Sequence, residues 1–200
     1  MDGTGTRAAE HRAMRADARR NYDRLLLAAD AAFAERGADA SLEDIARRAG
    51  VGIGTLYRHF PTRLALLEAV YLDRVRALRA RAEELRRTGP PGDALAGWLR
   101  ALAAHNITYR GLKGLLLTAM RDENSPLSSC RGLLLTAAGE LLGDAQRAGV
   151  VRRDIEPAEL VKLVHGVVVA SEYAEDHAAQ VDRLLTVMLD GLRHQPGGHR

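Results

Sequence analysis

The sequence is poor in cysteine and lacks both a membrane-spanning apolar run and a signal for export. Its 200 residues contain one cysteine, Cys130, which excludes an internal disulfide framework and a zinc site built from several cysteines. We expect this residue to be either a buried free thiol or a redox-sensitive one. No apolar run is long enough to cross a bilayer, and the N-terminal residues MDGTGTRAAE lack the apolar centre of a secretory signal. These absences together favour a cytoplasmic protein.

Alternation of β-branched with polar residues, the mark of strands, is also missing over any useful length. Apolar residues instead recur along the chain at the spacing of one helix face. In the first such segment, which ends before Gly37, they lie at Tyr22, Leu25, Leu26, Ala29 and Phe33. The pattern predicts an all-α fold.

Two short helices joined by a glycine turn are predicted in residues 41–63, SLEDIARRAGVGIGTLYRHFPTR. Ser41 and Asp44 have the spacing of a capping box, in which the serine oxygen accepts a backbone N–H and the acidic side chain returns to the cap. Gly50 supplies the turn, and Phe60 ends the second helix because a residue before proline disfavours helical geometry. The segment therefore predicts a helix-turn-helix unit.

The basic charge is concentrated in the half of the chain that holds this unit. Residues 1–88 contain 17 arginines and 13 acidic residues, whereas the remainder contains 12 basic and 13 acidic residues. No acidic residue occurs between Ile45 and Leu67. A small helical unit with only positive charge suits a polyanion, and we expect duplex DNA. Two alternatives stay open, because Arg47 and Arg48 could be merely solvated and the helix pair could be an ordinary hairpin.

The second helix of such a unit lies in the major groove of DNA. Leu56 and Phe60 are expected to face the core, which leaves the other side of the helix outward. Hydroxyls there can donate to phosphates, glycine permits close approach, and cations can reach phosphates or base edges. Tyr57 could alternatively pack in the core. The predicted DNA-binding residues are Ser41, Gly54, Thr55, Tyr57, Arg58, His59 and Arg63.

The string GVGIGTLYRHFPTR, preceded by SLEDIARRA, resembles the DNA-binding domain of the tetracycline-repressor (TetR) family of transcriptional regulators. The resemblance covers about residues 18–70. It implies an all-helical homodimer that binds a palindromic operator, with a ligand pocket in the C-terminal domain. It also implies DNA contacts at Thr55, Tyr57, His59 and Arg63. Gly52 and Ile53 depart from the family, where many members place Ser, Lys or Arg, so base reading at the start of this helix is expected to be reduced.

We therefore expect an all-α protein with an N-terminal three-helix helix-turn-helix domain and a larger C-terminal helical domain for ligand binding and dimerisation. The expected boundaries are a flexible basic arm (1–16), the DNA-binding domain (17–63), the ligand-binding and dimerisation domain (64–194) and a flexible tail (195–200). By resemblance the protein is a repressor that a small hydrophobic ligand releases from DNA. Activators and ligand-independent members also exist.

Two apolar stripes near the C-terminus suggest a dimer interface, and the alternative is that they form the intramolecular core. They comprise Leu160, Val161, Val164, Val167 and Val168, and then Leu184, Leu185, Val187, Met188 and Leu192. The candidates for a ligand pocket are aromatic, polarisable or titratable residues among apolar neighbours. They are Trp98, His105, Tyr109, Met120, His165, Glu172 and Tyr173, each of which could instead be structural.

The sequence offers little support for catalysis or metal binding. The histidines lack carboxylates at metal-ligand spacing, and no H-E-x-x-H occurs. We expect no metal, cofactor or catalytic residue. The two rival hypotheses are a helical enzyme using His105, His165 or Glu172 and a protein-binding scaffold with a vestigial DNA reader.

Overall fold

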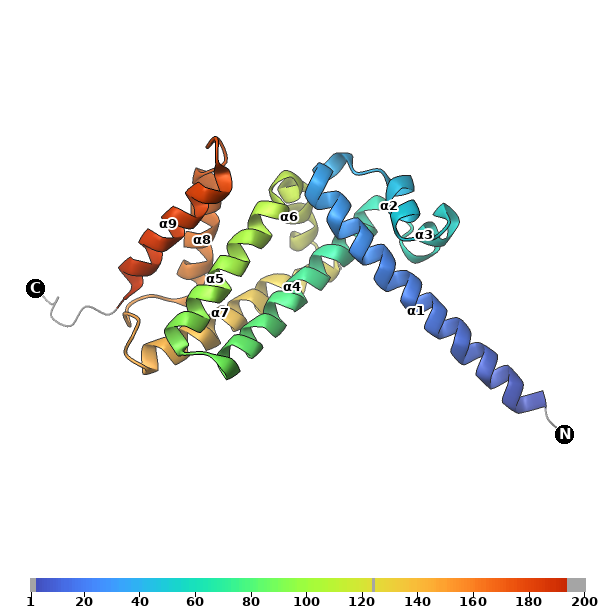
Figure 1. Ribbon diagram of the computed structural model, residues 1–200, viewed down its shortest axis with the longest axis horizontal. Helices are drawn as coiled ribbons and strands as arrows, with labels where there is room; N and C mark the ends of the chain where they lie inside the picture. The colour runs from blue at the N-terminus through green and yellow to red at the C-terminus, as the bar shows by residue number, and fades with distance from the viewer. Residues whose placement is uncertain (1–2, 124, 194–200) are drawn as a thin grey trace, which may run out of the picture. The chain divides into compact units, whose positions relative to one another are not determined.

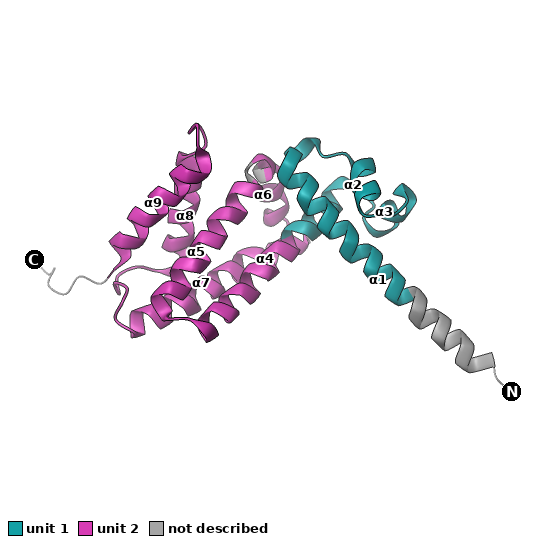
Figure 2. Cartoon of the chain, in the orientation of Figure 1, with its two compact units in different colours: residues 1–71 teal, residues 72–200 magenta. Residues whose placement is uncertain are grey.

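The computed structural model describes residues 3–123 and 125–193. These residues confirm the predicted all-α fold (Figure 1), and the chain divides into two compact units. Unit 1 comprises residues 1–71 and unit 2 residues 72–200 (Figure 2). The two meet within one continuous helix, later than the predicted boundary between residues 63 and 64.

Unit 1 is a small helical domain whose elements follow the predicted order. Glycine ends α1, because Gly37 has a φ of +56° that residues with a side chain rarely adopt. A short 3₁₀ turn (Gly37–Asp39) then leads into α2. The helices of this unit are α1 (Gly3–Arg36), α2 (Leu42–Arg48), α3 (Ile53–His59) and the first turns of α4 (Arg63–Thr88).

The helix α1 begins earlier than the sequence predicted. Its backbone is helical from Gly3, whereas the sequence predicted a flexible arm over residues 1–16. Ala and Arg, which together make up half of residues 3–16, are good helix formers. Extending an existing helix also needs no new nucleus. The first two residues of the expected arm and the expected tail at 195–200 lie outside the described residues.

Unit 2 is a bundle of packed helices around a leucine- and alanine-rich core. The core is centred on Trp98, which is fully buried and donates its indole N–H to the carbonyl of Leu78 at 3.0 Å. Two short 3₁₀ turns, Arg110–Leu112 and Pro126–Ser129, precede the third and fourth of its helices. Those helices are the rest of α4, α5 (Pro91–Thr108), α6 (Lys113–Arg121), α7 (Cys130–Arg147), α8 (Pro157–Ala170) and α9 (His177–Leu192).

The end of α8 is fixed by side chains that lie beyond the helix. The helix ends at Ala170, where the hydroxyl of Ser171 donates back to the carbonyl of Val167 at 2.9 Å. The imidazole Nδ1 of His177 in turn lies 2.7 Å from the carbonyl oxygen of Ser171. These contacts close the turn between α8 and α9 and place Tyr173 outside the helix.

Most of the two predicted interface stripes belong to the intramolecular core. Leu160, Val164 and Val168 of α8 are buried in it, as are Leu185 and Leu192 of α9. The alternative that the sequence left open therefore holds for these residues. Val187, a member of the second stripe, remains exposed, and so do two α8 residues outside the stripes, Leu163 and Val169. In the described part of the chain, the helices are too short or too polar for any of them to span a membrane.

Candidate nucleic-acid interface

The start of α2 is capped by Ser41, but the predicted capping box is only half formed. The Ser41 hydroxyl accepts the backbone N–H of Asp44 at 3.2 Å, as expected. It also donates to the carboxylate of Glu43 at 2.9 Å. The expected return of the Asp44 side chain to the cap is wrong, since this carboxylate binds arginines instead. Ser41, predicted to contact DNA, is thus engaged in capping.

Asp44 is the centre of an ion-pair network between α1 and α2. Its side chain is nearly buried and pairs with Arg47, with Arg48 Nε at 2.9 Å and with Arg36 Nη1 at 3.8 Å. Arg48 also donates to Glu35 Oε1 at 2.9 Å. Burial by itself raises the pKa of the Asp44 carboxyl, but the Arg47 hydrogen bond and the neighbouring guanidinium charges outweigh it and lower that pKa. The hydrogen bond from Arg48 likewise lowers the pKa of Glu35.

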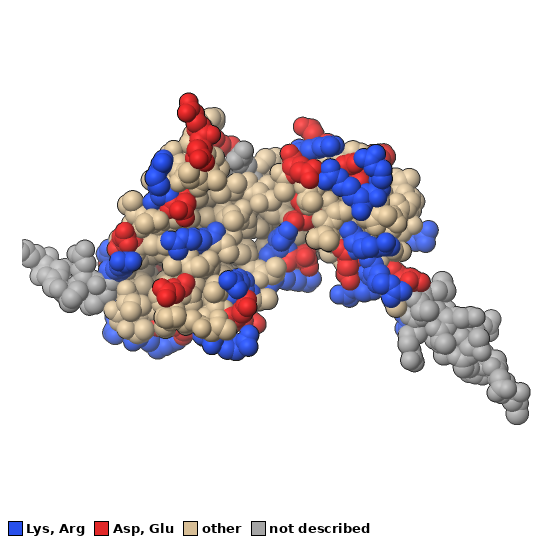
Figure 3. Space-filling view, in the orientation of Figure 1, with Lys and Arg blue, Asp and Glu red and all other residues tan. Residues whose placement is uncertain are grey.

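The Asp44 network compensates part of the positive charge in the acid-free stretch between Ile45 and Leu67. Arg47 and Arg48 contribute half of the arginines in that stretch, and both are paired with acids that lie before it in the sequence. Figure 3 accordingly shows basic and acidic side chains interleaved over unit 1 rather than a uniformly basic face. The alternative that Arg47 and Arg48 are merely solvated is wrong, because both form ion pairs.

The helix α3 presents one side to solvent. Leu56 is fully buried beneath it, whereas Gly54 and Arg58 are exposed and Thr55 is half-buried. Tyr57 is 46% exposed, so the alternative that it packs in the core does not hold. The phenol of Tyr57 and the guanidinium of Arg58 are therefore accessible to a ligand on this side of unit 1.

An aromatic cluster holds the C-terminal end of α3 against α1. The ring centroid of Tyr22 lies 6.0 Å from that of His59 in an edge-to-face arrangement and 5.1 Å from that of Phe60. Such contacts orient the half-buried imidazole of His59. The spacing of Tyr22 predicts that it lies on the inner face of α1, but nothing in that spacing indicates that its ring touches a predicted DNA contact.

Arg63 is bound within unit 1. Its guanidinium donates to the backbone carbonyl of Ala40, the residue just before the cap of α2. The side chain is half-buried, and its charge helps to lower the pKa of the Glu43 carboxyl, after a backbone hydrogen bond and the Ser41 hydroxyl. Arg63 thus ties the beginning of α4 to the beginning of α2, which explains why the unit boundary falls beyond it.

The predicted ligand-binding residues are dispersed over unit 2. His105 and Tyr109 are buried neighbours on α5 and its cap, with ring centroids 5.0 Å apart. Trp98 is part of the core, and the half-buried Met120 and His165 lie on α6 and α8. Glu172 and Tyr173 follow α8, and the tyrosine is 96% exposed. Glu172 is exposed as well, so these two residues do not line an enclosed cavity.

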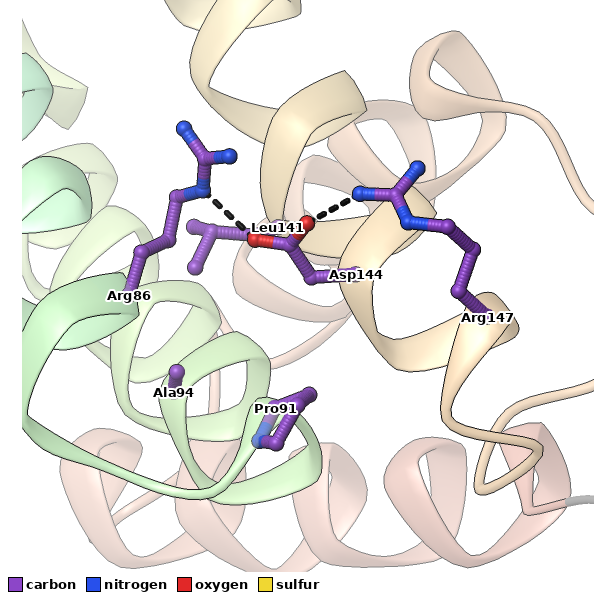
Figure 4. Close-up of a pocket in the computed structure, with 6 residues that line it drawn as sticks. All are labelled: Arg86, Pro91, Ala94, Leu141, Asp144 and Arg147. Carbon is purple, nitrogen blue, oxygen red and sulfur yellow. Dashed lines mark hydrogen bonds and ion pairs between the residues drawn. The ribbon is translucent and has the colours of Figure 1, made fainter.

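A hollow of about 240 Å³ lies elsewhere in unit 2, where the end of α4, the start of α5 and α7 meet (Figure 4). None of the predicted ligand residues lines it. Asp144 projects into it and accepts hydrogen bonds from Arg86 Nε at 2.6 Å and from Arg147. The hydrogen bond from Arg86 lowers the pKa of the Asp144 carboxyl despite partial burial. The hollow is thus polar and internally paired, unlike the apolar pocket that the sequence predicted. Among the described residues, no three His, Cys, Asp or Glu side chains gather as a metal ion would require.

Comparison with known proteins identifies both units. The family model of bacterial regulatory proteins of the tetR family matches residues 25–70, and that of the C-terminal domain of SbtR-like transcriptional regulators matches residues 90–194. The chain belongs to the TetR family. TetR-family members are transcriptional regulators, so the chain is a regulator with a DNA-binding domain and not an enzyme.

Solved TetR-family structures resemble the chain over nearly their whole length. The TetR regulator SCO0520 of Streptomyces coelicolor is 38% identical, with 87% of this chain and 99% of that chain covered and a TM-score of 0.76. A TetR regulatory protein of Mycobacterium vanbaalenii is also 38% identical, with 90% and 99% covered and a TM-score of 0.68. A structure reported as the molecular basis for control of antibiotic production by bacterial hormones is 25% identical, with 86% and 97% covered and a TM-score of 0.67. A search of the curated proteins finds no match.

Proposed function

We propose that this TetR-family regulator is a cytoplasmic homodimeric repressor that binds a palindromic operator through α3 and leaves it when a small hydrophobic ligand binds in unit 2. The observation that carries the proposal is the exposed side of α3. Tyr57 and Arg58 project there from a helix that Leu56 fixes to the core of unit 1. A phenol and a guanidinium on a rigid helix can donate to phosphates and to base acceptors.

Exposed apolar residues on α8 and α9 support the dimer. Leu163 and Val169 are each more than two-fifths exposed on α8, and Val187 is 69% exposed on α9. A symmetric contact would bury the same surface on both protomers. It would also provide two copies of α3, which must lie about 34–36 Å apart to enter successive major grooves.

The repressor mechanism requires coupling between the two units, and α4 is the element that can supply it. This helix has 26 residues and is therefore about 39 Å long. Its first turns belong to unit 1 and the rest to unit 2. A ligand that binds unit 2 better in one arrangement of α4 would shift the population of DNA-competent dimers by its difference in affinity.

The ligand itself is proposed to be small and mostly apolar with one or two polar anchors. The buried pair His105 and Tyr109 is the best placed part of the predicted set to provide such anchors. A relative whose structure concerns control of antibiotic production by bacterial hormones supports a diffusible signal of this kind.

The test is a binding measurement with the full-length protein and a duplex from the DNA that flanks its own coding region. The proposal expects salt-sensitive binding by a dimer and a loss of affinity with at least one member of a library of apolar small molecules. Binding that no small molecule alters would contradict ligand release. Absence of specific binding over a random duplex of equal length would contradict operator recognition.

A further inference from the structure

The structure points to Arg24 of α1 as a DNA phosphate contact that complements the exposed side of α3. We infer that its guanidinium binds a backbone phosphate beside the turn between α2 and α3. This inference deepens the proposed operator binding and rests on it. The Asp44 network already occupies several arginines of unit 1, so DNA has to bind cations outside it.

Ion pairs occupy five of the α1 and α2 arginines whose side chains the structure describes. On α1, Arg19 pairs with Asp23 at 3.2 Å and Arg20 with Asp17. Arg36, Arg47 and Arg48 share Asp44 and Glu35, as described above. A phosphate that recruited one of these arginines would have to compete with a carboxylate already in place. Such sites therefore contribute less to the release of counterions from DNA.

Arg24 and Arg58 differ from these residues. Within the described part of the chain, neither has a carboxylate within ion-pairing distance, and both are exposed. Arg24 has one neutral partner, the amide oxygen of Asn21. Its positive charge is therefore uncompensated by an acidic side chain. Arg63 is already bound to the carbonyl of Ala40.

Arg24 lies beside the turn between α2 and α3. Its Nη1 lies 3.5 Å from the point that a Cβ on Gly50 would occupy, so the guanidinium rests beside the turn. The φ of Gly50 is +65°, which makes glycine the favoured residue there. The next two glycines, Gly52 and Gly54, are exposed, and an added Cβ at either would meet no atom within 4 Å. A sugar-phosphate strand can approach such a surface closely, with one cation on each side, Arg24 on α1 and Arg58 on α3.

The experiment measures how operator affinity of the full-length protein depends on salt. Each phosphate contact adds a slope of about −0.9 to the plot of log K against log salt concentration. Arg24→Gln is expected to make the slope shallower by about 0.9 per protomer and to weaken binding to the operator and to a random duplex alike. Arg24→Lys should restore most of the slope, because it keeps the positive charge.

The matched control is Arg19→Gln, which removes the same charge from the same helix at a side chain paired with Asp23. It should leave the slope close to that of the unmodified protein. An Arg24→Gln slope equal to the control slope would overturn the inference. A variant with lower affinity, an unchanged slope and a lower unfolding temperature would also overturn it, because Arg24 would then only support the turn. If either outcome occurs while the unmodified protein binds with a steep slope, the proposed operator binding stands. If the unmodified protein shows no salt-sensitive binding, both proposals are wrong.

Discussion

Single side chains decide what α3 can offer to DNA. The Tyr57 hydroxyl is on the exposed side of this helix, and removing it leaves the buried Leu56 beneath untouched. Tyr57→Phe is therefore expected to weaken operator binding by the proposed dimer roughly 25-fold, since each of its two protomers loses a hydrogen bond worth about 1 kcal/mol. Its unfolding temperature should match that of the unmodified protein. Gel-shift titration and thermal unfolding check the two halves of this prediction, and unchanged affinity would remove Tyr57 from the interface.

The single cysteine is a second case in which one residue's environment fixes its chemistry. Cys130 is fully buried at the start of α7, and this burial raises the pKa of its thiol to about 11. The thiolate is the reactive form, and it is scarce at neutral pH under these conditions. We expect iodoacetamide to leave the native protein unlabelled at pH 7 and to label it fully in guanidinium chloride. Rapid labelling of the native protein would favour the redox-sensitive alternative.

At the scale of elements, the packing of α2 against α1 depends on a charged group rather than on apolar contact alone. The pKa of Asp44 is lowered in the folded protein from its ordinary value of 3.8. The stability that this group contributes is thus fully present above that value and is lost as the pH falls through the lower folded value. Asp44→Asn should reduce the unfolding temperature of unit 1 at pH 7, and the difference from the unmodified protein should shrink at pH 3.

The matched control for this prediction is Asp39→Asn, which changes an exposed aspartate just before α2. Circular dichroism melts of both variants at the two pH values provide the measurement. A difference for Asp44→Asn that persists undiminished at pH 3 would show that the network does not act through the ionised carboxylate.

At the scale of the whole molecule, the exposed apolar residues of α8 and α9 are the candidates for the proposed dimer contact, and Val187 is the one among them that the predicted stripes include. Val187→Asp should raise the dimer dissociation constant by at least about tenfold, because burying an unpaired carboxylate costs more than about 1.4 kcal/mol. Sedimentation velocity measures this shift. Thr136→Asp, at an exposed position of α7, is the control. An unchanged dimer for Val187→Asp would place the interface elsewhere.

Local signals in the sequence were sufficient for the architecture. The positive φ values of Gly37 and Gly50 and the Ser41 cap occur where the sequence placed stops and starts, because glycine conformation and side-chain capping act within a few residues. The end of α8 could not be predicted in this way, because it depends on Ser171 and on the imidazole of His177 beyond the turn.

The site was harder to predict than the fold because its charges are compensated across helices. Arg48 pairs with Glu35, which lies on another element, and no spacing rule within a helix relates the two. The apolar stripes of α8 and α9 were likewise hard to interpret from sequence. Periodicity identifies an apolar face, but it does not say whether the covering partner is the same chain or a second copy. Leu160 and Val164 were covered from within, and Val187 was not.

The helix α4 has a practical consequence for anyone who wishes to dissect this regulator. Compact units are usually separated by a pliable linker, whereas here Tyr71 and Leu72 are consecutive residues of one helix. A fragment ending at Tyr71 would keep only the first turns of α4, and short isolated helices fray in water. A stand-alone DNA-binding fragment should therefore end after Thr88, the last residue of α4.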